Sequence, residues 1–532
     1  MFRHWLCSGL CLAVASTGLA ADRKKQRPVA GLRLGPETTI ISTPLNDLGY
    51  PDYVTALNDR LSEGVAPEEN FWTAYDETLP RNVLGDNYFR QLVATPGFER
   101  ASTITWASYC PEGTDADKAN KQLDIAMSRP WKAGECPIIA SWLEKNRPAL
   151  DRITEATRRP KSFAPSITGN AGETMAHVLL PHVQQTRDAA RAFNARAFLA
   201  LSEGRTEDAW QDVLTIQRLA KHQQSSPFVI GSLVGLAISA IGRIPAEAVI
   251  AEPSSTPEAT LRRWKELAET LGRESRDNSW LMGERFCTLD LTLAIRSARA
   301  EPADILGNVT VISPLGTESE GSLFEIDLSK ARQSFQSAML TLGDVNESLI
   351  YTNRYLDRIA DAFAEPDYLD RRAALQAAQK EFLDGKNPDD LGQVATAFLF
   401  GGPDAVSSIA QASVAHHFAA TYLQCNNAEA RQIARTRLLH AAFAAELHYQ
   451  STGTDVTDSG DLDRAIEKFA ALAGVTLPEV KDPHSRASFR VMRDDERLVI
   501  YGIGENGRSD GGKTFGEGEG CDDLVVVLKR GL

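Results

Sequence analysis

A glycine-rich acidic segment near the end of the chain has the residue types that best fit a chemical role. Two predicted strands, 497–501 and 524–528, close the base of this segment. Hard cations such as Ca²⁺ take about six to eight oxygen ligands, which a loop supplies through carboxylates and carbonyls. The segment therefore predicts a calcium-stapled loop, with a solvated acidic turn without an ion as the alternative. The candidate ligands are Asn506, Asp510, Glu519, Asp522 and Asp523.

The same segment also matches the pattern of a phosphate-binding loop, G-x-x-x-x-G-K-[ST], from Gly507 to Thr514. That loop needs a strand before it and a helix after it, because the helix N-terminus and its amides hold the phosphates. The residues after Thr514 are glycine-rich and acidic, so they favour no helix and would place carboxylates beside a triphosphate. We therefore expect no nucleotide site here.

Cysteine spacing gives one candidate disulfide. None of the cysteines after residue 20 forms the C-x-x-C motif of zinc and redox sites. Cys110 and Cys136 flank one polar segment with Gly and Pro, so they are the best candidate pair in an oxidising compartment. Two separate buried thiols are the alternative, since spacing does not establish connectivity.

The nine histidines give weak catalytic signals and no H-E-x-x-H motif. His416 and His417 are adjacent, so on a helix they would diverge by about 100° and could not bind one metal together. His177 and His182, five positions apart in the sequence, are equally poor as a pair of ligands. We expect packing or surface roles for the histidines.

The first twenty residues indicate export. Residues 1–20 have a basic start, a short apolar run and small residues up to Ala20, which is the pattern of a cleaved signal peptide. An uncleaved membrane anchor is the alternative, but the apolar run is shorter than the ~20 residues of a span. Loss of Arg3 with the signal leaves 56 basic against 71 acidic residues, a net charge of −15. This charge argues against nucleic-acid and anionic-membrane binding and favours divalent cations or basic partners.

Hydrophobic periodicity predicts a mainly α protein, an antiparallel helical array followed by a small C-terminal α+β domain with a three-stranded antiparallel sheet. The predicted segments are 1–20, a signal peptide; 21–50, a linker or extended segment; 51–160, an N-terminal helical region with the Cys110/Cys136 loop; 161–430, the helical array; and 431–532, the α+β tail. Helices are predicted over 53–61, 138–157, 174–201, 206–220, 227–242, 257–273, 278–299, 329–363, 366–384 and 462–473, with a helix pair in 404–449 and strands over 488–492, 497–501 and 524–528. The stretch 301–326 is predicted as a loop, short strands or a boundary between helical layers.

Two helical segments invite a more specific interpretation. The pair 174–201 and 206–220 resembles a tetratricopeptide-type hairpin, with Gly204 at the turn, Thr206 as the cap of the second helix and an apolar face that starts at Ala209. The family's period of roughly 34 residues does not recur, so we predict a helical array rather than that family. The uncharged segment 227–242 has two glycines four apart, as in membrane dimerisation helices. It is short and ends near Pro245, so we predict a buried core helix and no transmembrane span in the mature chain.

The tail resembles the periplasmic part of a type II secretion major pseudopilin. The residues that carry this resemblance are Arg437 to Leu439, Tyr449, Gly453, Pro478, Asp482–Pro483, Leu498 to Gly507, Asp510 to Gly512 and Asp522–Asp523. The resemblance implies calcium binding by Asp510, Asp522 and Asp523. Ser509 stands where an aspartate often precedes Asp510, and the apolar pilin helix is missing, so we expect no assembly into a pseudopilus. The helical region, notably 52–58 and 142–150, resembles uncharacterised exported bacterial proteins.

These features favour an exported, non-catalytic binding or scaffold protein of the cell envelope, periplasmic or extracellular, with a protein or envelope polymer as its partner. The alternative is an envelope-polymer hydrolase that uses a carboxylate pair in a helical cleft. Glu284 and Asp290 are one such pair, although we prefer to interpret them as solvated helix charges. No G-x-S-x-G motif supports a serine hydrolase.

Overall fold

The computed structural model describes most of the chain after residue 28. The described residues are 29–78, 86–99, 104, 106–168, 173–272, 278–297, 344–386, 393, 396, 402–477, 479–493, 496–515 and 517–529, with 402–420 described as backbone only. The predicted signal peptide, the stretch 301–326 and the first part of the predicted helix 329–363 lie outside these residues.

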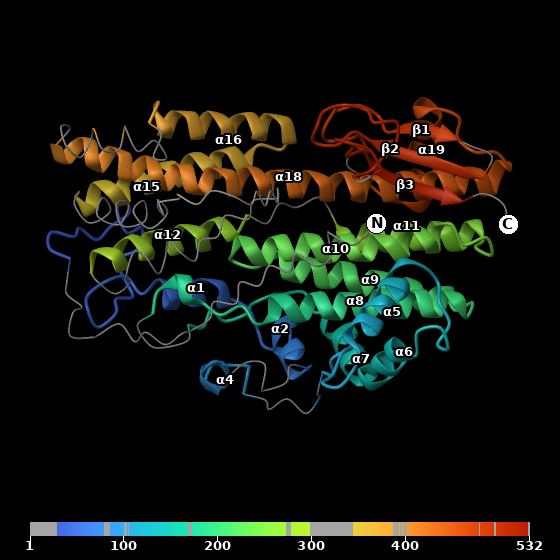
Figure 1. Ribbon diagram of the computed structural model, residues 1–532, viewed down its shortest axis with the longest axis horizontal. Coiled ribbons are helices and arrows are strands. Elements are labelled where there is room, and N and C mark those ends of the chain that lie inside the picture. The colour runs from blue at the N-terminus through green and yellow to red at the C-terminus, as the bar shows by residue number, and fades with distance from the viewer. Residues whose placement is uncertain are drawn as a thin grey trace, which may run out of the picture.

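The described chain is mainly α-helical with a small antiparallel sheet near its end, so the predicted fold class is confirmed (Figure 1). The helices are α1 (Tyr53–Ser62), α2 (Phe71–Tyr75), η2 (Asp76–Thr78), α4 (Asp86–Val93), α5 (Ala116–Ser128), α6 (Pro137–Lys145), α7 (Arg147–Ala156), η3 (Met175–His177), α8 (His182–Ser202), α9 (Thr206–Gln224), α10 (Val229–Ile250), α11 (Pro257–Leu271), α12 (Trp280–Arg296), α15 (Val345–Ala364), α16 (Tyr368–Leu383), α18 (Gly402–Thr452) and α19 (Ser459–Ala473). The strands are β1 (Arg490–Arg493), β2 (Arg497–Gly502) and β3 (Leu524–Lys529).

The turn between α8 and α9 matches the prediction, but the cap of α9 does not. Gly204 follows the end of α8 with φ +74°, the left-handed conformation that glycine adopts at little cost. The predicted core face of α9 is buried, including Ala209 and Val213. The cap prediction is wrong, because Thr206 is the first residue of the helix and Arg205 precedes it without a side-chain capping bond.

Prolines divide two of the predicted helices. The predicted helix 138–157 is wrong as one element, because Pro148 lies at the start of α7 and α6 ends before Asn146. Asn146 stabilises the break: its side chain accepts a hydrogen bond from Ala107 N (2.8 Å) and donates to Trp142 O (3.0 Å). The predicted helix 174–201 is likewise too long, since α8 begins after Pro181 and residues 175–177 form the separate turn η3.

The glycines of α10 serve helix packing within the protein. A Cβ atom at Gly235 would lie 2.6 Å from Gln224 N and 2.8 Å from Ala220 O of α9, so the two helices approach too closely for any side chain there. The helix continues through Pro245 to Ile250, beyond the predicted end. It is long and apolar enough to cross a membrane, and 44% of its apolar window is buried inside the protein.

The longest element is α18, a single helix of 51 residues where we predicted a helix pair. That prediction is wrong because no glycine or proline interrupts the alanine-rich sequence between Pro403 and Gly453. In Figure 1, α18 runs along most of the molecule, with α15 and α16 at one end and the tail at the other. It contacts α10, α11, α15, α16, α19 and two strands of the sheet.

The tail is the predicted three-stranded meander, in the order β1–β2–β3. Leu498 of β2 pairs with Leu528 of β3, and both side chains are fully buried. The tail is joined to α18 by hydrogen bonds. Arg431 and Asn427 of α18 both bind the Glu505 carboxylate, and Arg437 donates to Lys481 O (2.8 Å).

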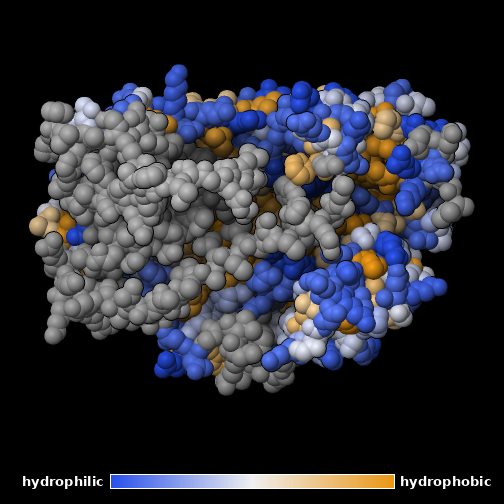
Figure 2. All heavy atoms as spheres, viewed as in Figure 1, coloured by the Kyte–Doolittle hydropathy of each residue, from blue (hydrophilic) through white to orange (hydrophobic). Residues whose placement is uncertain are grey.

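One hydrophobic core runs through all three predicted segments of the mature chain. Phe71, Trp210 and Leu528 belong to the same cluster of buried residues, although they come from 51–160, 161–430 and 431–532 respectively. The predicted boundaries between these segments remain predictions. On the face shown in Figure 2, the described surface is largely hydrophilic with apolar patches between, in keeping with a strongly acidic chain.

We predict that Phe443→Ala lowers the free energy of unfolding by about 3–5 kcal/mol, because it opens a cavity in the centre of the core. The Phe443 ring is fully buried, stacks on Trp264 at 6.1 Å and meets Trp210 edge-on at 5.8 Å. Denaturant unfolding followed by tryptophan fluorescence measures the change. Phe515→Ala is the matched control, because that ring is 71% exposed, and its effect should stay within about 0.5 kcal/mol. Equal losses in the two variants would contradict this assignment of the core.

Candidate functional site

The acidic connection between β2 and β3 folds around the Asp523 side chain. This carboxylate is 2% exposed, and its Oδ2 accepts hydrogen bonds from Asp510 N (2.9 Å) and Gly512 N (2.8 Å). Asp523 N in turn donates to Lys513 O (3.2 Å). One buried carboxylate therefore holds the middle of the loop against the start of β3.

Asp522 and Asp510 connect the two ends of the loop. Asp522 Oδ2 accepts from Asn506 N (3.0 Å), and Asp510 Oδ2 accepts from both Asp522 N (2.9 Å) and Asn506 Nδ2 (2.9 Å). A Cβ atom at Gly504 would lie 2.2 Å from Asp522 Cγ, so this close approach requires glycine. The structure thus brings together four of the five predicted ligands.

The fifth predicted ligand, Glu519, lies apart from this cluster. Its side chain is exposed and forms no hydrogen bond or ion pair with the described part of the chain. Among the described residues, no three His, Cys, Asp or Glu side chains form a ready set of metal ligands. A cation in this loop would therefore draw on backbone carbonyls and small shifts of the carboxylates as well as on the aspartates in place.

Two carboxylate oxygens in the loop are well suited to a cation. Asp522 Oδ1 and Asp523 Oδ1 are both buried and have no hydrogen-bond partner. A buried acceptor without a partner loses its hydration without compensation, and a bound cation would restore it. The residues present therefore fit a hard cation such as Ca²⁺.

The electrostatics of the loop point the same way. Burial raises the pKa of Asp523, the backbone N–H groups of Gly512 and Asp510 oppose this rise, and the nearby charges of Asp510 and Asp522 add to it. The pKa of Asp510 is lowered, chiefly by the backbone N–H of Asp522 and then by the Asn506 amide. The loop thus holds negative charge that its own hydrogen bonds only partly offset, and a divalent cation would complete the balance.

The phosphate-loop pattern lacks its structural context. The described residues after Thr514 form turns and bends rather than a helix. Glu517 Oε2 accepts hydrogen bonds from Thr514 N (2.6 Å) and from the Thr514 hydroxyl (2.8 Å). The Thr514 N–H and hydroxyl therefore already donate to a carboxylate within the loop. In a phosphate-binding loop these donors would point at the phosphate instead.

Cys110 and Cys136 are separate thiols in the structure. Cys136 is fully buried before α6, while Cys110 is partly exposed. Burial raises the pKa of the Cys136 thiol, so the neutral form is favoured. Their pairing in an oxidising compartment stays a prediction.

The carboxylates Glu284 and Asp290 are not solvated helix charges, so that interpretation was wrong. Asp290 is buried, and its Oδ2 accepts a hydrogen bond from Met175 N (2.7 Å). Glu284 Oε1 accepts from Val229 N (3.0 Å) at the start of α10, and burial raises its pKa to about 6. Each carboxylate satisfies a backbone amide, a structural role that helical periodicity alone does not reveal.

Sequence reasoning missed a buried polar cluster of Asp76, Tyr88 and His182. Tyr88 Oη lies 3.0 Å from His182 Nε2, and His182 Nδ1 lies 3.6 Å from Asp76 Oδ1. Burial raises the pKa of Asp76 well above its ordinary value and lowers that of His182 to about 4, so both groups tend to be neutral. The three residues come from η2, α4 and α8, and no sequence motif joins them.

Comparisons with known proteins do not identify the chain: no family model, no curated protein and no solved structure matches it. The pseudopilin resemblance of the tail therefore rests on the residues named above.

We predict that acidification from pH 6.5 toward pH 4 destabilises the protein through its buried histidines. Burial lowers the pKa of His182, His222 and His440 to about 4. Between pH 6.5 and 4 the unfolded chain therefore binds more protons than the folded chain, and stability falls as the pH falls.

His440 offers the sharpest test of this prediction, because its Nδ1 accepts a hydrogen bond from Trp264 Nε1 (2.8 Å). The free energy of unfolding should depend less steeply on pH in His440→Gln than in the wild type, by up to about 1.4 kcal/mol per pH unit. The partly exposed His448 gives the control, His448→Gln. Identical slopes for wild type and His440→Gln would show that His440 is not buried as a neutral group.

Proposed function

We propose that this protein is an exported, non-catalytic binding or scaffold protein of the cell envelope, whose C-terminal loop is ordered by Ca²⁺. The observation that carries the calcium proposal is the pair of buried, unpartnered oxygens, Asp522 Oδ1 and Asp523 Oδ1. Carboxylate oxygens in a loop rich in backbone carbonyls are the donor set that Ca²⁺ prefers. Asp510 and Asn506, hydrogen-bonded to each other and to the same loop, supply further oxygens nearby.

The attachment of the tail to the helical array supports a scaffold role for this loop. Glu505 lies at the beginning of the loop, and its two carboxylate oxygens bind Asn427 and Arg431 of α18. Glu505 therefore joins the start of the loop directly to α18, the longest described helix. A helical array with an extended surface is a common platform for binding another protein or a polymer. The anionic chain favours a basic partner.

We predict that adding Ca²⁺ to the chelator-treated protein raises its stability. Asp522→Asn and Asp523→Asn should each raise the Ca²⁺ concentration needed for this effect at least tenfold. A ligand that binds the folded state alone adds about 2.7 kcal/mol at a concentration of 100 Kd. Thermal unfolding and calorimetric titration with CaCl₂ measure the effect, with MgCl₂ as a second cation.

The control for this experiment is Asp124→Asn, an isosteric change at an exposed position of α5. It should leave the calcium response unchanged. The calcium proposal would be overturned if calorimetric titration detected no Ca²⁺ binding to the wild-type protein. It would also be overturned if the calcium response were unchanged in both Asp522→Asn and Asp523→Asn. Pull-down from envelope extract with and without chelator then tests the scaffold role: a specific partner lost on chelation supports it, and no partner in either condition contradicts it.

A further inference from the structure

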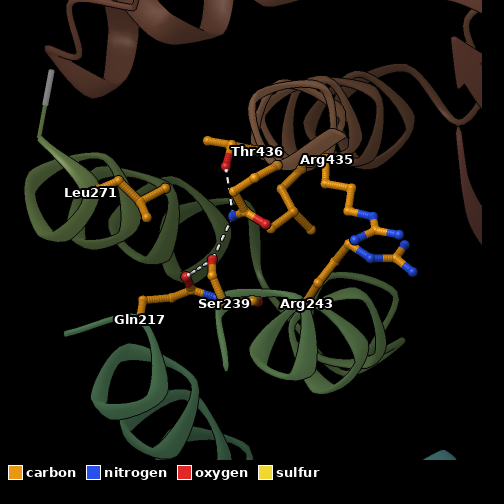
Figure 3. Close-up of a pocket in the computed structure, with 8 residues that line it drawn as sticks. Gln217, Ser239, Arg243, Leu271, Arg435 and Thr436 are labelled. Atoms are coloured by element: carbon orange, nitrogen blue, oxygen red, sulfur yellow. Dashed lines mark hydrogen bonds between the residues drawn. The ribbon is translucent and has the colours of Figure 1, made fainter. Parts of the chain in front are cut away.

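The two outer strands of the tail's sheet have different surroundings. β3 packs against α10 and α18, and Arg243 of α10, shown in Figure 3 opposite Arg435 of α18, donates to Val525 O (3.2 Å). β1 contacts β2 and α19, and it pairs with β2 along one side only. In Figure 1 it lies farther from α10 and α11 than β3 does. β1 is therefore an open edge of the sheet, while β3 is held against the helical array.

The free side of β1 presents unpaired backbone groups. The strand's residues, Arg490–Arg493, pair with residues 498–501 of β2. Within the described chain, no backbone N–H or C=O group of β1 bonds to a group outside the sheet. An edge strand of this kind is a template for pairing with another strand. β1 can therefore accept an extended segment through main-chain hydrogen bonds, the binding mode known as β-strand addition.

The side chains along this edge decide what such a segment must carry. Arg490 and Met492 pair with Tyr501 and Val499. Because side chains alternate along a strand, these four lie on the face opposite to the fully buried Leu498, which we call the outer face. Arg490 is exposed and has no ion pair or side-chain hydrogen bond in the described chain. Met492 is 45% exposed. The edge thus offers a cation and an apolar side chain, two positions apart on one face.

The acidic loop between β2 and β3 already covers part of the outer face. A Cβ atom at Gly512 would lie 3.5 Å from Val499 Cγ1 and 3.7 Å from Met492 Cε, so the loop lies over β2 and reaches β1. A segment bound at the edge would therefore extend the sheet sideways rather than lie on top of it. On the opposite face of β1, Val491 packs against the main hydrophobic core. An added strand would thus meet a second apolar side chain there.

We propose that the β1 edge binds an extended acidic segment of another protein as an additional strand, with a carboxylate beside Arg490 and apolar side chains beside Val491 and Met492. Opposite charges and apolar pairs on neighbouring strands stabilise a sheet, and like charges destabilise it. A carboxylate also matches the guanidinium group in geometry, so the pair can form two parallel hydrogen bonds.

The same arginine gives the edge its selectivity. A short edge strand with basic residues resists pairing with basic or purely apolar strands, so it favours an acidic partner. The chain as a whole is strongly acidic and attracts basic partners. The β1 edge is therefore a second interaction surface, with the opposite charge preference and with no dependence on the calcium proposal.

The test titrates a fluorescein-labelled peptide with the full mature chain and follows fluorescence anisotropy. The peptide has the core Glu-Val-Val-Glu, which fits β1 in either strand direction. The comparison peptides are one with the core Lys-Val-Val-Lys and the acidic peptide N-methylated at both valines, which removes main-chain donors. The wild type should bind the acidic peptide at least about tenfold more tightly than either of them.

Arg490→Glu is the decisive variant. It should weaken binding of the acidic peptide at least about tenfold and strengthen binding of the lysine peptide, because the charge preference of the edge is reversed. Its circular dichroism should match that of the wild type, since Arg490 is exposed. Arg464→Glu, at a side chain 72% exposed on α19, is the matched control and should bind both peptides as the wild type does.

Several results would overturn the proposal. Absence of binding between the wild type and the acidic peptide would refute it, and so would an unchanged affinity in Arg490→Glu. Equal binding of the N-methylated peptide would show that contact is made by side chains without strand addition. Sedimentation of the wild type as a dimer and of Arg490→Glu as a monomer would assign the edge to a second copy of the chain instead of an acidic partner.

Discussion

The constraint on which the rest of the structure depends is the burial, on every side, of residues 438–447 of α18. From Leu438 to Leu447 every side chain is buried, and most of them are alanine or leucine. Such small side chains let α10, α11, α19 and the sheet approach one helix from several directions. Because these neighbours come from distant parts of the sequence, the long helix makes one core out of the array and the tail.

Burial on every side creates a problem for the polar groups near that helix, and the structure answers it with specific partners. Trp264 satisfies His440 within the core, and Arg431 and Arg437 turn toward the tail to bind Glu505 and the Lys481 carbonyl. Arg435 lies between these two arginines in sequence, and its side chain is only partly buried.

Sequence periodicity correctly predicted elements whose boundaries depend on local sequence. It failed to predict a boundary that depends on contacts between residues far apart in the chain. The apolar face of α9, the helix α19 and the three strands are short, regular patterns, and they were found. The break at Asn146 depends on a proline and on a hydrogen bond to Ala107, and the second of these is not visible in the sequence. The continuity of α18 was missed although the sequence contains its signal, the absence of Gly and Pro between Pro403 and Gly453, because a pair of helices with a tight turn has the same average periodicity as one long helix.

The candidate sites show the same division. Asp510, Asp522 and Asp523 lie within one connection, so the sequence alone could place them together, and Glu519 was included because spacing does not tell which side chain turns outward. Asp76, Tyr88 and His182 come from three separate elements. No pattern of spacing can bring such residues together before the packing of the helices is known.

The way in which Asp523 is bound also explains why the loop and the cation would depend on each other. Its Oδ2 is committed to the amides of Asp510 and Gly512, which need an acceptor whether or not a cation is present. A proton or a cation must therefore go to Oδ1, the oxygen that has no partner. A cation in this loop would compete with a proton for that one atom, and burial raises the pKa of Asp523. Calcium in this loop would thus replace a proton at Oδ1 and leave intact the hydrogen bonds that shape the backbone.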